Sequence, residues 1–179
     1  MNNLRQEKKI IFENKQLNYL YLFLKKNNFK KIYPDRNIYS IYYDTPSLKL
    51  FQDSEEGVTP RSKIRVRAYS KHFFVDKTYL EEKISLDHCR KKTSKLLKNK
   101  KFLKRIFNSK HGYLYPKVAI SYKRSYYSDE RFRITLDRNL KYSSVKSFNN
   151  LFNINFIDKL NSLEIKYDNV IPYYIFQKK

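Results

Sequence analysis

The sequence predicts an α+β protein in which an antiparallel β-barrel carries a few helices on its outside. Charged residues recur at every second position of five strand-like segments, apolar residues fill the positions between them in three of the five, and amphipathic helical segments interrupt the strands. Side chains two apart on a strand share a face, so each segment aims a row of charges in one direction. A closed barrel with a charged lumen and an apolar, helix-covered outside satisfies every strand at once. The charged rows are Glu7/Lys9, Lys63/Arg65/Arg67, Glu81/Lys83, Arg131/Arg133 and Glu164/Lys166.

The first half of the chain predicts four strands and two helices. A helix over 14–31 follows the first strand, with Asn14 as a plausible cap and an apolar stripe every three to four residues. Pro46 suits the first turn of a short helix running to about Ser54, which Thr45 caps. Asp44 is expected to cap the same helix. The predicted strands are 4–12, 38–43 and the hairpin 62–70 with 77–86.

The second half predicts a basic helix, another hairpin and a last strand. The helix covers 93–109, where apolar residues form a stripe against a very basic face and His111-Gly112 ends it. The hairpin joins 114–127 to 130–138, residues Asn149–Asn155 read as a loop, and the last strand is 160–168. The chain contains no internal repeat and no linker. We therefore expect one domain over residues 1–179.

The charge of the chain points to a polyanionic partner. The formal net charge is +22 over 179 residues, which favours nucleic acid, an anionic membrane or a phosphate chain. The only glycines are Gly57 and Gly112, so the glycine-rich loops that cradle phosphates in nucleotide-binding folds are excluded. A phosphate-binding site in this chain must therefore use side chains, and lysine and arginine supply them.

Other features of the composition favour a soluble, cytoplasmic protein. Cys89 is the one cysteine, so no internal disulfide can form, and a reducing compartment fits. The residues from Met1 to Lys9 contain no apolar core of a signal peptide. No stretch approaches the ~20 apolar residues that a membrane-spanning helix needs.

Taken in order, eight short segments resemble the VTC domain. This domain is the polyphosphate polymerase module of the triphosphate tunnel metalloenzyme, or CYTH-like, superfamily. The resemblance covers about residues 4–175. The segments are Arg5–Lys9, Ser40–Pro46, Pro60–Arg67, Leu80–Lys83, Lys91-Lys92, Tyr122–Arg124, Arg133–Arg138 and Leu163–Asp168.

The resemblance implies a tunnel inside the barrel that binds a triphosphate and Mn²⁺ or Mg²⁺. It implies an enzyme that transfers the γ-phosphate of ATP onto a growing polyphosphate chain, with no specific nucleic acid as partner. An association with a membrane partner is also compatible with it. The implied catalytic phosphate contacts are Lys9, Arg65, Arg67, Lys83, Arg124 and Arg133. Further substrate contacts are Lys63, Lys91, Lys92, Lys166 and Arg131, and the metal ligand is Glu164, with Glu7 and Glu81 as helpers.

The chain departs from the family pattern at two places. Arg5 stands where the superfamily often has the first of two alternating glutamates, and a site poorer in carboxylates resembles the polymerase branch. The family often continues into a helix beyond the segment that ends here at Lys179. Two other functions stay open: a metal-dependent triphosphatase of the same fold, and a non-catalytic module that binds polyphosphate or RNA.

Each charged row also has a purely structural interpretation. Lys63, Arg65 and Arg67 alone could be the solvated face of an edge strand. The Glu81/Lys83 and Glu164/Lys166 pairs could be cross-strand ion pairs of modest worth. Residues at strand ends and aromatic residues of the barrel wall are expected to be structural. These are Asp137 and Asp168 as turn formers, and Tyr42, Tyr43 and Tyr122 as wall aromatics.

Overall fold

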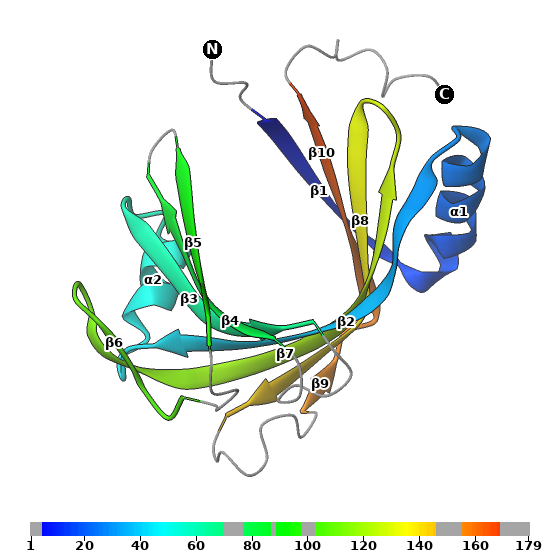
Figure 1. Cartoon of the computed structure of the whole chain (residues 1–179). Coiled ribbons are helices and arrows are strands. Elements are labelled where there is room, and N and C mark those ends of the chain that lie inside the picture. Colours follow the sequence, from blue (N-terminus) through cyan, green and yellow to red (C-terminus); the bar gives the residue numbers. More distant parts are fainter. Residues whose placement is uncertain (1–4, 70–76, 87–88, 98–102, 146–154, 169–179) are drawn as a thin grey trace. The chain divides into compact units, whose positions relative to one another are not determined.

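The structure is a computed structural model that describes residues 5–69, 77–86, 89–97, 103–145 and 155–168 (Figure 1). Most of these residues lie in β-strands, accompanied by two α-helices and one 3-10 helix. The helices are η1 (Asn14–Gln16), α1 (Leu17–Lys26) and α2 (Lys49–Glu55). The strands are β1 (Arg5–Glu13), β2 (Lys30–Asp44), β3 (Arg61–Ala68), β4 (Thr78–Ser85), β5 (Arg90–Leu96), β6 (Ile106–Asn108), β7 (Gly112–Ser128), β8 (Phe132–Ser144), β9 (Phe156–Ile157) and β10 (Leu160–Asp168).

The strands hydrogen-bond in the order β1-β10-β8-β7-β2-β3-β4-β5, while β6 pairs with β7 and β9 with β8. Antiparallel register joins β1 to β10, β10 to β8, β2 to β3, β3 to β4 and β4 to β5. The predicted α+β class, with an antiparallel sheet and a few helices, is confirmed. In the described part of the chain β1 and β5 are the ends of the path and no pairing joins them, so the sheet is not closed into the predicted barrel.

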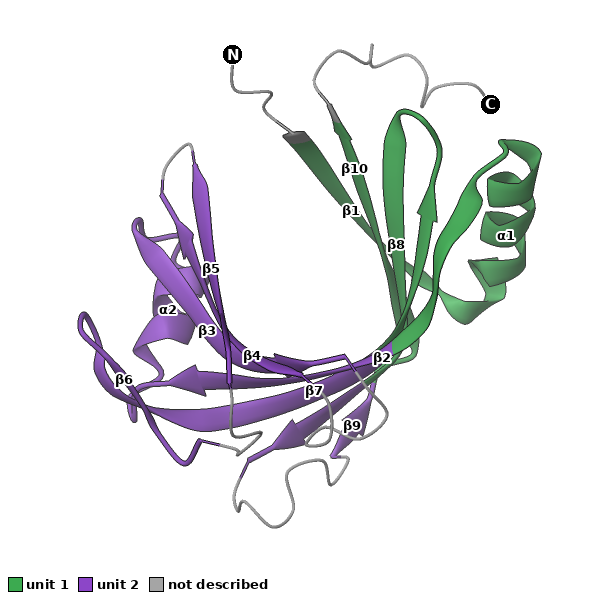
Figure 2. Cartoon of the chain, in the orientation of Figure 1, with its two compact units in different colours: residues 1–36, 123–140, 158–179 green, residues 37–122, 141–157 purple. Residues whose placement is uncertain are grey.

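The chain divides into two compact units, which Figure 2 colours separately. Unit 1 comprises residues 1–36, 123–140 and 158–179, and unit 2 comprises residues 37–122 and 141–157. Strands β2, β7 and β8 contribute residues to both units. Each unit has its own apolar core, so each is described by itself below.

The core of unit 1 lies between helix α1 and one face of β8 and β10. Leu163 pairs with Leu136 and Ile165 pairs with Ile134, and all four side chains are buried together with Leu24 of α1. Because strand side chains alternate between faces, the residues between these positions lie on the opposite face. That opposite face carries Glu7 and Lys9 of β1, Arg133 of β8, and Glu164 and Lys166 of β10.

The core of unit 2 is built in the same way from β2, β3 and helix α2. Ile41 pairs with Val66 and Tyr43 with Ile64, and these side chains pack with Leu50 of α2. The charged residues of β3 again occupy the alternate positions, on the other face.

Helix α2 is held in place by the cap that the sequence predicts. The Asp44 carboxylate accepts hydrogen bonds from the backbone N–H groups of Leu50 and Phe51, both at 2.9 Å. The Thr45 hydroxyl accepts one from the N–H of Lys49, also at 2.9 Å. Asp44 and Thr45 are therefore confirmed as caps, although the helix begins at Lys49 rather than at Pro46.

Two sequence-based expectations about the helices are wrong. Residues 90–96 form strand β5 and residues 106–108 form strand β6, so no helix covers 93–109, of which 98–102 lie outside the described residues. The apolar residues that mimic a helical stripe belong instead to two separate short segments. Asn14 does not cap the first helix either. It lies inside η1, and its side-chain oxygen accepts a hydrogen bond from Asn161 at 2.9 Å.

Several predicted features fall on undescribed parts of the chain. These are the tip of the first hairpin and most of the loop Asn149–Asn155. The expectation of a single domain over residues 1–179 stays a prediction.

Candidate phosphate-binding site

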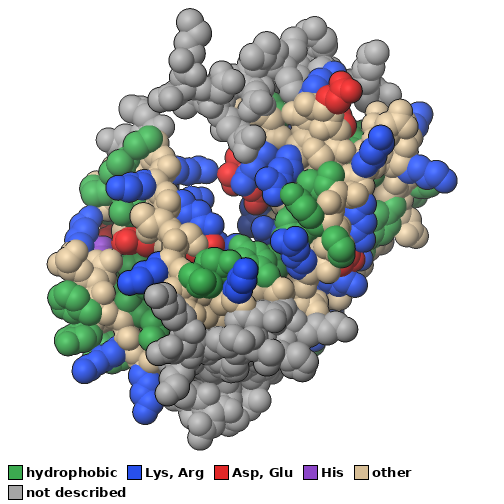
Figure 3. Space-filling model, in the orientation of Figure 1, with side chains coloured by type: hydrophobic (Ala, Val, Ile, Leu, Met, Phe, Trp, Pro, Cys, Tyr) green, Lys and Arg blue, Asp and Glu red, His purple; other side chains and the backbone are tan. Residues whose placement is uncertain are grey.

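Five of the predicted phosphate-binding residues share one face of unit 2. Alternation along β3 places Lys63, Arg65 and Arg67 opposite the buried side chains of its core face. The register pairs Lys63 with Lys83 and Lys83 with Lys92. Three lysines therefore lie side by side across β3, β4 and β5, and we call them the lysine row. In the view of Figure 3, lysine and arginine side chains gather beside these strands.

The lysine row brings three positive charges close together. Residues directly opposite on neighbouring strands have Cβ atoms about 5 Å apart, and like charges there are destabilising. Two unit charges ~6 Å apart at an effective dielectric of ~20 repel by roughly 3 kcal/mol. Lys63, Lys83 and Lys92 therefore form a row of concentrated positive charge, in which Lys92 pairs with Glu81.

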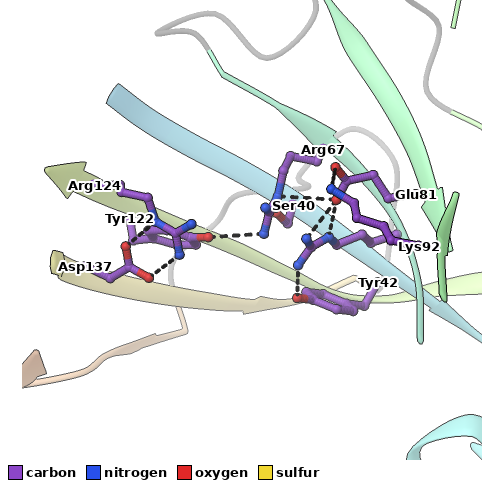
Figure 4. Close-up of polar contacts among 9 residues, drawn as sticks. Ser40, Tyr42, Arg67, Glu81, Lys92, Tyr122, Arg124 and Asp137 are labelled. Carbon is purple, nitrogen blue, oxygen red and sulfur yellow. Dashed lines mark hydrogen bonds and ion pairs between the residues drawn. The ribbon is translucent and has the colours of Figure 1, made fainter. Parts of the chain in front are cut away.

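Glu81 is the one carboxylate that β3, β4 and β5 place on this face, and three neighbouring cations contact it. Its side chain is 4% exposed. Arg65 donates to its Oε2 from Nε at 2.8 Å and contacts the same atom from a terminal nitrogen at 2.7 Å. Lys92 Nζ donates to Oε1 at 2.7 Å, and Arg67 Nε lies 3.9 Å from Oε2 (Figure 4). One carboxylate thus holds three cations in fixed positions.

Hydroxyl groups of β2 and β7 orient the two arginines. Arg65 donates to the Tyr42 hydroxyl at 2.8 Å, and Arg67 donates to Ser40 and to the Tyr122 hydroxyl, both at 3.2 Å (Figure 4). The sequence-based assignment of Tyr42 and Tyr122 as wall aromatics missed this polar role. The signal was available in the alternation of Ser40 and Tyr42, which places both on the face opposite the apolar Ile41.

The pKa of Glu81 responds to two opposing effects. Burial opposes ionisation, but the hydrogen bond from Lys92 and the charge and hydrogen bond of Arg65 outweigh it, so the pKa lies below its usual value. A carboxyl group with a depressed pKa stabilises the fold fully above its unfolded-state pKa of 4.5, and this contribution is lost as pH falls through the folded-state pKa.

We therefore expect thermal stability to fall as pH drops below about 4.5, with a shallower decline in the Glu81→Gln variant. Melting temperatures measured between pH 6 and pH 3 in both proteins check this. Parallel curves for the two proteins would show that Glu81 does not couple folding to protons.

The charged face of unit 1 carries a more even mixture of positive and negative side chains than the face of unit 2. Register places Glu7 opposite Lys166 and Lys166 opposite Arg133, while the next row places Lys9 opposite Glu164. Carboxylates and cations therefore alternate along and across β1 and β10, while Lys166 and Arg133 place two cations side by side. All five residues were predicted for the site, and the structure gathers them on one face of unit 1.

Arg124 is engaged by a carboxylate that the sequence analysis had assigned to a turn. Its Nε lies 2.5 Å from Asp137 Oδ1, and a terminal nitrogen lies 2.6 Å from Oδ2 (Figure 4). Asp137 sits inside β8 rather than at its end, because β8 continues to Ser144. The turn assignment of Asp137 is therefore wrong, and Arg124 is a bidentate, partly neutralised cation.

Glu7 and Glu164 offer the better fit to a divalent cation. Both carboxylates converge on one positive centre, since Lys166 Nζ lies 3.8 Å from Glu7 Oε2 and 2.5 Å from Glu164 Oε1. One or two carboxylates suffice for Mg²⁺ when phosphates and water complete its ligands. Glu81 belongs to unit 2, where three cations hold it. No group of three or more metal-binding side chains occurs among the described residues.

Two predicted substrate contacts lie away from these faces. Lys91 pairs with Ile84 and therefore faces the side of β5 opposite Lys92. Arg131 lies in the turn between β7 and β8, where its N–H bonds to Asp129 and its guanidinium lies 5.7 Å from the Phe132 ring centroid. Alternation with Arg133 had suggested a shared strand face, but β8 begins only at Phe132.

Comparison with known proteins decides the family. The family model of the VTC domain matches residues 4–111 and 89–177. The chain belongs to the VTC domain family. This VTC domain matches no curated protein significantly.

Solved structures show the same fold. A Bacillus halodurans protein described as a candidate adenylate cyclase superposes with a TM-score of 0.55 at 14% identity, covering 93% of this chain and 82% of that one. A Vibrio parahaemolyticus protein with the same description gives 0.51 at 13% identity, covering 96% and 80%. Family and neighbours together support a triphosphate-tunnel fold for this VTC domain. In the part of the chain that the structure describes, no helix is long and apolar enough to cross a membrane.

Proposed function

We propose that this VTC domain is an ATP-dependent polyphosphate polymerase that transfers the γ-phosphate of ATP onto a growing polyphosphate chain. The observation that carries the proposal is the lysine row beside Arg65 and Arg67. A chain of phosphates carries negative charge along its length, so it is matched by cations set in a row rather than by one point charge. The enclosed tunnel that the sequence predicts stays part of this proposal.

The residues present suit phosphoryl transfer, which needs positioning and charge neutralisation more than covalent help. A terminal oxygen of the polyphosphate chain attacks the γ-phosphorus of ATP, the bond from that phosphorus to the β–γ bridging oxygen breaks, and ADP leaves with the bonding electrons. The attacking oxygen is already anionic, so no general base is required. Arg65 and Arg67 supply planar donors to phosphate oxygens, and the lysines supply point charges.

Mg²⁺ or Mn²⁺ would be held by Glu7 and Glu164. A bound divalent cation supplies charge neutralisation at phosphate oxygens. Lys166, which both carboxylates contact, is then free to move its ammonium group to a phosphate. Lys9 and Arg133 flank these residues on the same face and add positive charge for the substrate.

A metal-dependent triphosphatase is the second candidate. The convergence of Glu7 and Glu164 favours it, because a carboxylate-bound metal ion also suits the attack of water on a triphosphate. The imbalance of unit 2, where five cations share a face with Glu81, favours the polymerase, since a long anionic product needs many cations.

Incubation with ATP and Mn²⁺ is expected to yield phosphate chains long enough to form a ladder on a polyacrylamide gel. The physical reason is that the product stays on a cationic surface and is extended again before it dissociates. Formation of orthophosphate alone would identify a triphosphatase. Tight, salt-dependent binding of polyphosphate without turnover would identify a non-catalytic module and contradict both enzymes.

A further inference from the structure

Helix α1 exposes an apolar stripe on the side turned away from the core of unit 1. Tyr19 is 76% exposed, Leu22 is 65% exposed and Phe23 is 54% exposed. Leu22 and Phe23 follow Tyr19 by three and four residues, so all three lie on one side of the helix. The other side of the helix already packs on the sheet through Leu17, Leu20, Tyr21 and Leu24. The fold therefore uses one side of α1 and leaves a second apolar side uncovered among the described residues.

The uncovered stripe is surrounded by positive charge. Residues 14–31 contain five lysines and no aspartate or glutamate. Lys15 and Lys26 continue the line of Tyr19 and Leu22 at a spacing of three to four residues, so a lysine stands at each end of the stripe. Lys15 also forms an exposed ion pair with Glu13 at 2.8 Å, a type of pair that contributes little and that an anionic partner can replace. An apolar helical side that carries aromatic residues and leucine beside lysines is the pattern of helices that lie in the membrane interface.

We propose that α1 docks unit 1 on an anionic lipid surface. Tyr19, Leu22 and Phe23 enter the boundary between headgroups and acyl chains, and the lysines at the two ends of the stripe meet lipid phosphates. This docking surface is independent of the proposed polymerase activity, because its residues lie on the side of the sheet opposite Glu7, Lys9 and Arg133.

The size and charge of the stripe favour lipid over a protein partner. A ten-residue helix is about 15 Å long. One side of such a helix is too small to supply alone the roughly 800 Å² that each partner buries in a stable protein interface. A second copy of this chain would bring lysines against lysines. An anionic membrane provides both the negative charge and the apolar depth, and each lysine near its surface adds to the attraction.

Part of the stripe is fixed in position before any lipid arrives. The Phe23 ring stacks on Phe29 with centroids 6.4 Å apart, and Phe29 lies 6.5 Å from the Phe132 ring of β8. Phe23 is therefore tied to the core, and its replacement would disturb folding. Tyr19 and Leu22 are more exposed, so variants at these two positions give the cleaner test.

The chain contains no tryptophan, so Leu22→Trp places a unique fluorophore on the stripe. With vesicles of phosphatidylcholine and phosphatidylserine in a 3:1 ratio, we expect its emission to shift to the blue. With phosphatidylcholine alone we expect no shift. The matched control is Phe107→Trp in unit 2, where the native ring is 67% exposed, and its emission should change little in either case.

Cosedimentation with the same vesicles measures how much the apolar stripe contributes to lipid binding. Tyr19→Ser combined with Leu22→Ser should lower the bound fraction at least fivefold, and Lys25→Glu combined with Lys26→Glu should lower it similarly. The charge control, Lys104→Glu with Lys110→Glu, changes two exposed lysines of unit 2 and should lower it far less.

Four outcomes would overturn the proposal. Equal binding of the serine variant and the wild type would show that charge alone attracts the protein. An equal blue shift on neutral vesicles would remove the role of the lysines. Emission at Leu22→Trp that shifts with protein concentration, without lipid, would indicate that a second copy covers the stripe. Blue emission in dilute, lipid-free protein would indicate that another segment of the same chain covers it.

Discussion

Replacing Lys83 with alanine is expected to lower ATP-dependent polyphosphate formation by about 100-fold, a loss of about 2.7 kcal/mol of transition-state stabilisation. Lys83 is the middle member of the lysine row, so a phosphate chain on this face passes next to it. The thermal unfolding temperature should change little, because the Lys83 side chain is exposed. Gel detection of the product and a melting curve measure the two effects.

The matched control for this prediction is Lys91→Ala. Lys91 is the sequence neighbour of Lys92 on β5 but faces the opposite side of the strand. Its loss removes the same charge from the chain without changing the lysine row, so activity should stay near the wild-type value. Equal losses in the Lys83 and Lys91 variants would mean that total charge, and not its placement, supports turnover.

Replacing Glu81 with alanine is expected to destabilise the protein by about 3 kcal/mol, because it leaves the buried Arg67 and the partly buried Arg65 without their counterion. For a chain of this length the melting temperature should fall by roughly 10 °C. The burial of Glu81 and its contacts with Arg65, Arg67 and Lys92 make this the largest stability effect on the charged face.

Polyphosphate should restore much of the stability lost in the Glu81→Ala variant. Its phosphates supply negative charge to the same cations, so the rise in melting temperature on adding polyphosphate should be larger in the variant than in the wild type. Glu82→Ala is the matched control. Glu82 lies on the other face of β4, where it accepts one hydrogen bond from Asn108 at 3.2 Å, so its loss should cost less and show no rescue. An equal rise in all three proteins would contradict a role for Glu81 as the resident anion.

The charged faces of the two units differ in composition. Unit 2 concentrates positive charge around one carboxylate, whereas unit 1 mixes carboxylates with cations and brings Glu7 and Glu164 toward one lysine. In the proposed function, phosphates bind chiefly to the face of unit 2 and the metal ion to the face of unit 1. Separate variants on β4 and β10 can therefore separate substrate affinity from metal dependence.

Local periodicity predicted most of the strands correctly. The alternation of charged and apolar residues located β3, β4 and β10 to within one or two residues, and β10 matches its predicted range of 160–168. The same alternation fixed which residues share a face, because a strand turns successive side chains to opposite sides whatever lies around it. The motifs of the VTC domain were likewise visible in the order of short segments, and the family match confirms them.

Periodicity gave the wrong element where a segment was short and fitted both the helical and the strand pattern. Residues 93–109 satisfied a helical stripe, but the backbone of residues 90–96 instead completes the hydrogen bonds of β4. The sequence could not show which of Lys91 and Lys92 faces the site, because that follows from the register of β5 with β4. Asp137 was assigned to a turn because the length of β8 depends on its partner strands.

The sequence by itself determined the class of the fold and most residues of the charged rows, and its charge predicts a polyanionic partner. Only the tertiary structure decided that Lys63, Lys83 and Lys92 stand side by side, that Glu81 holds three cations, and that Arg124 is paired with Asp137. Alternation within a strand is a local property of the backbone, whereas the register between strands arises from contacts between residues distant in the chain.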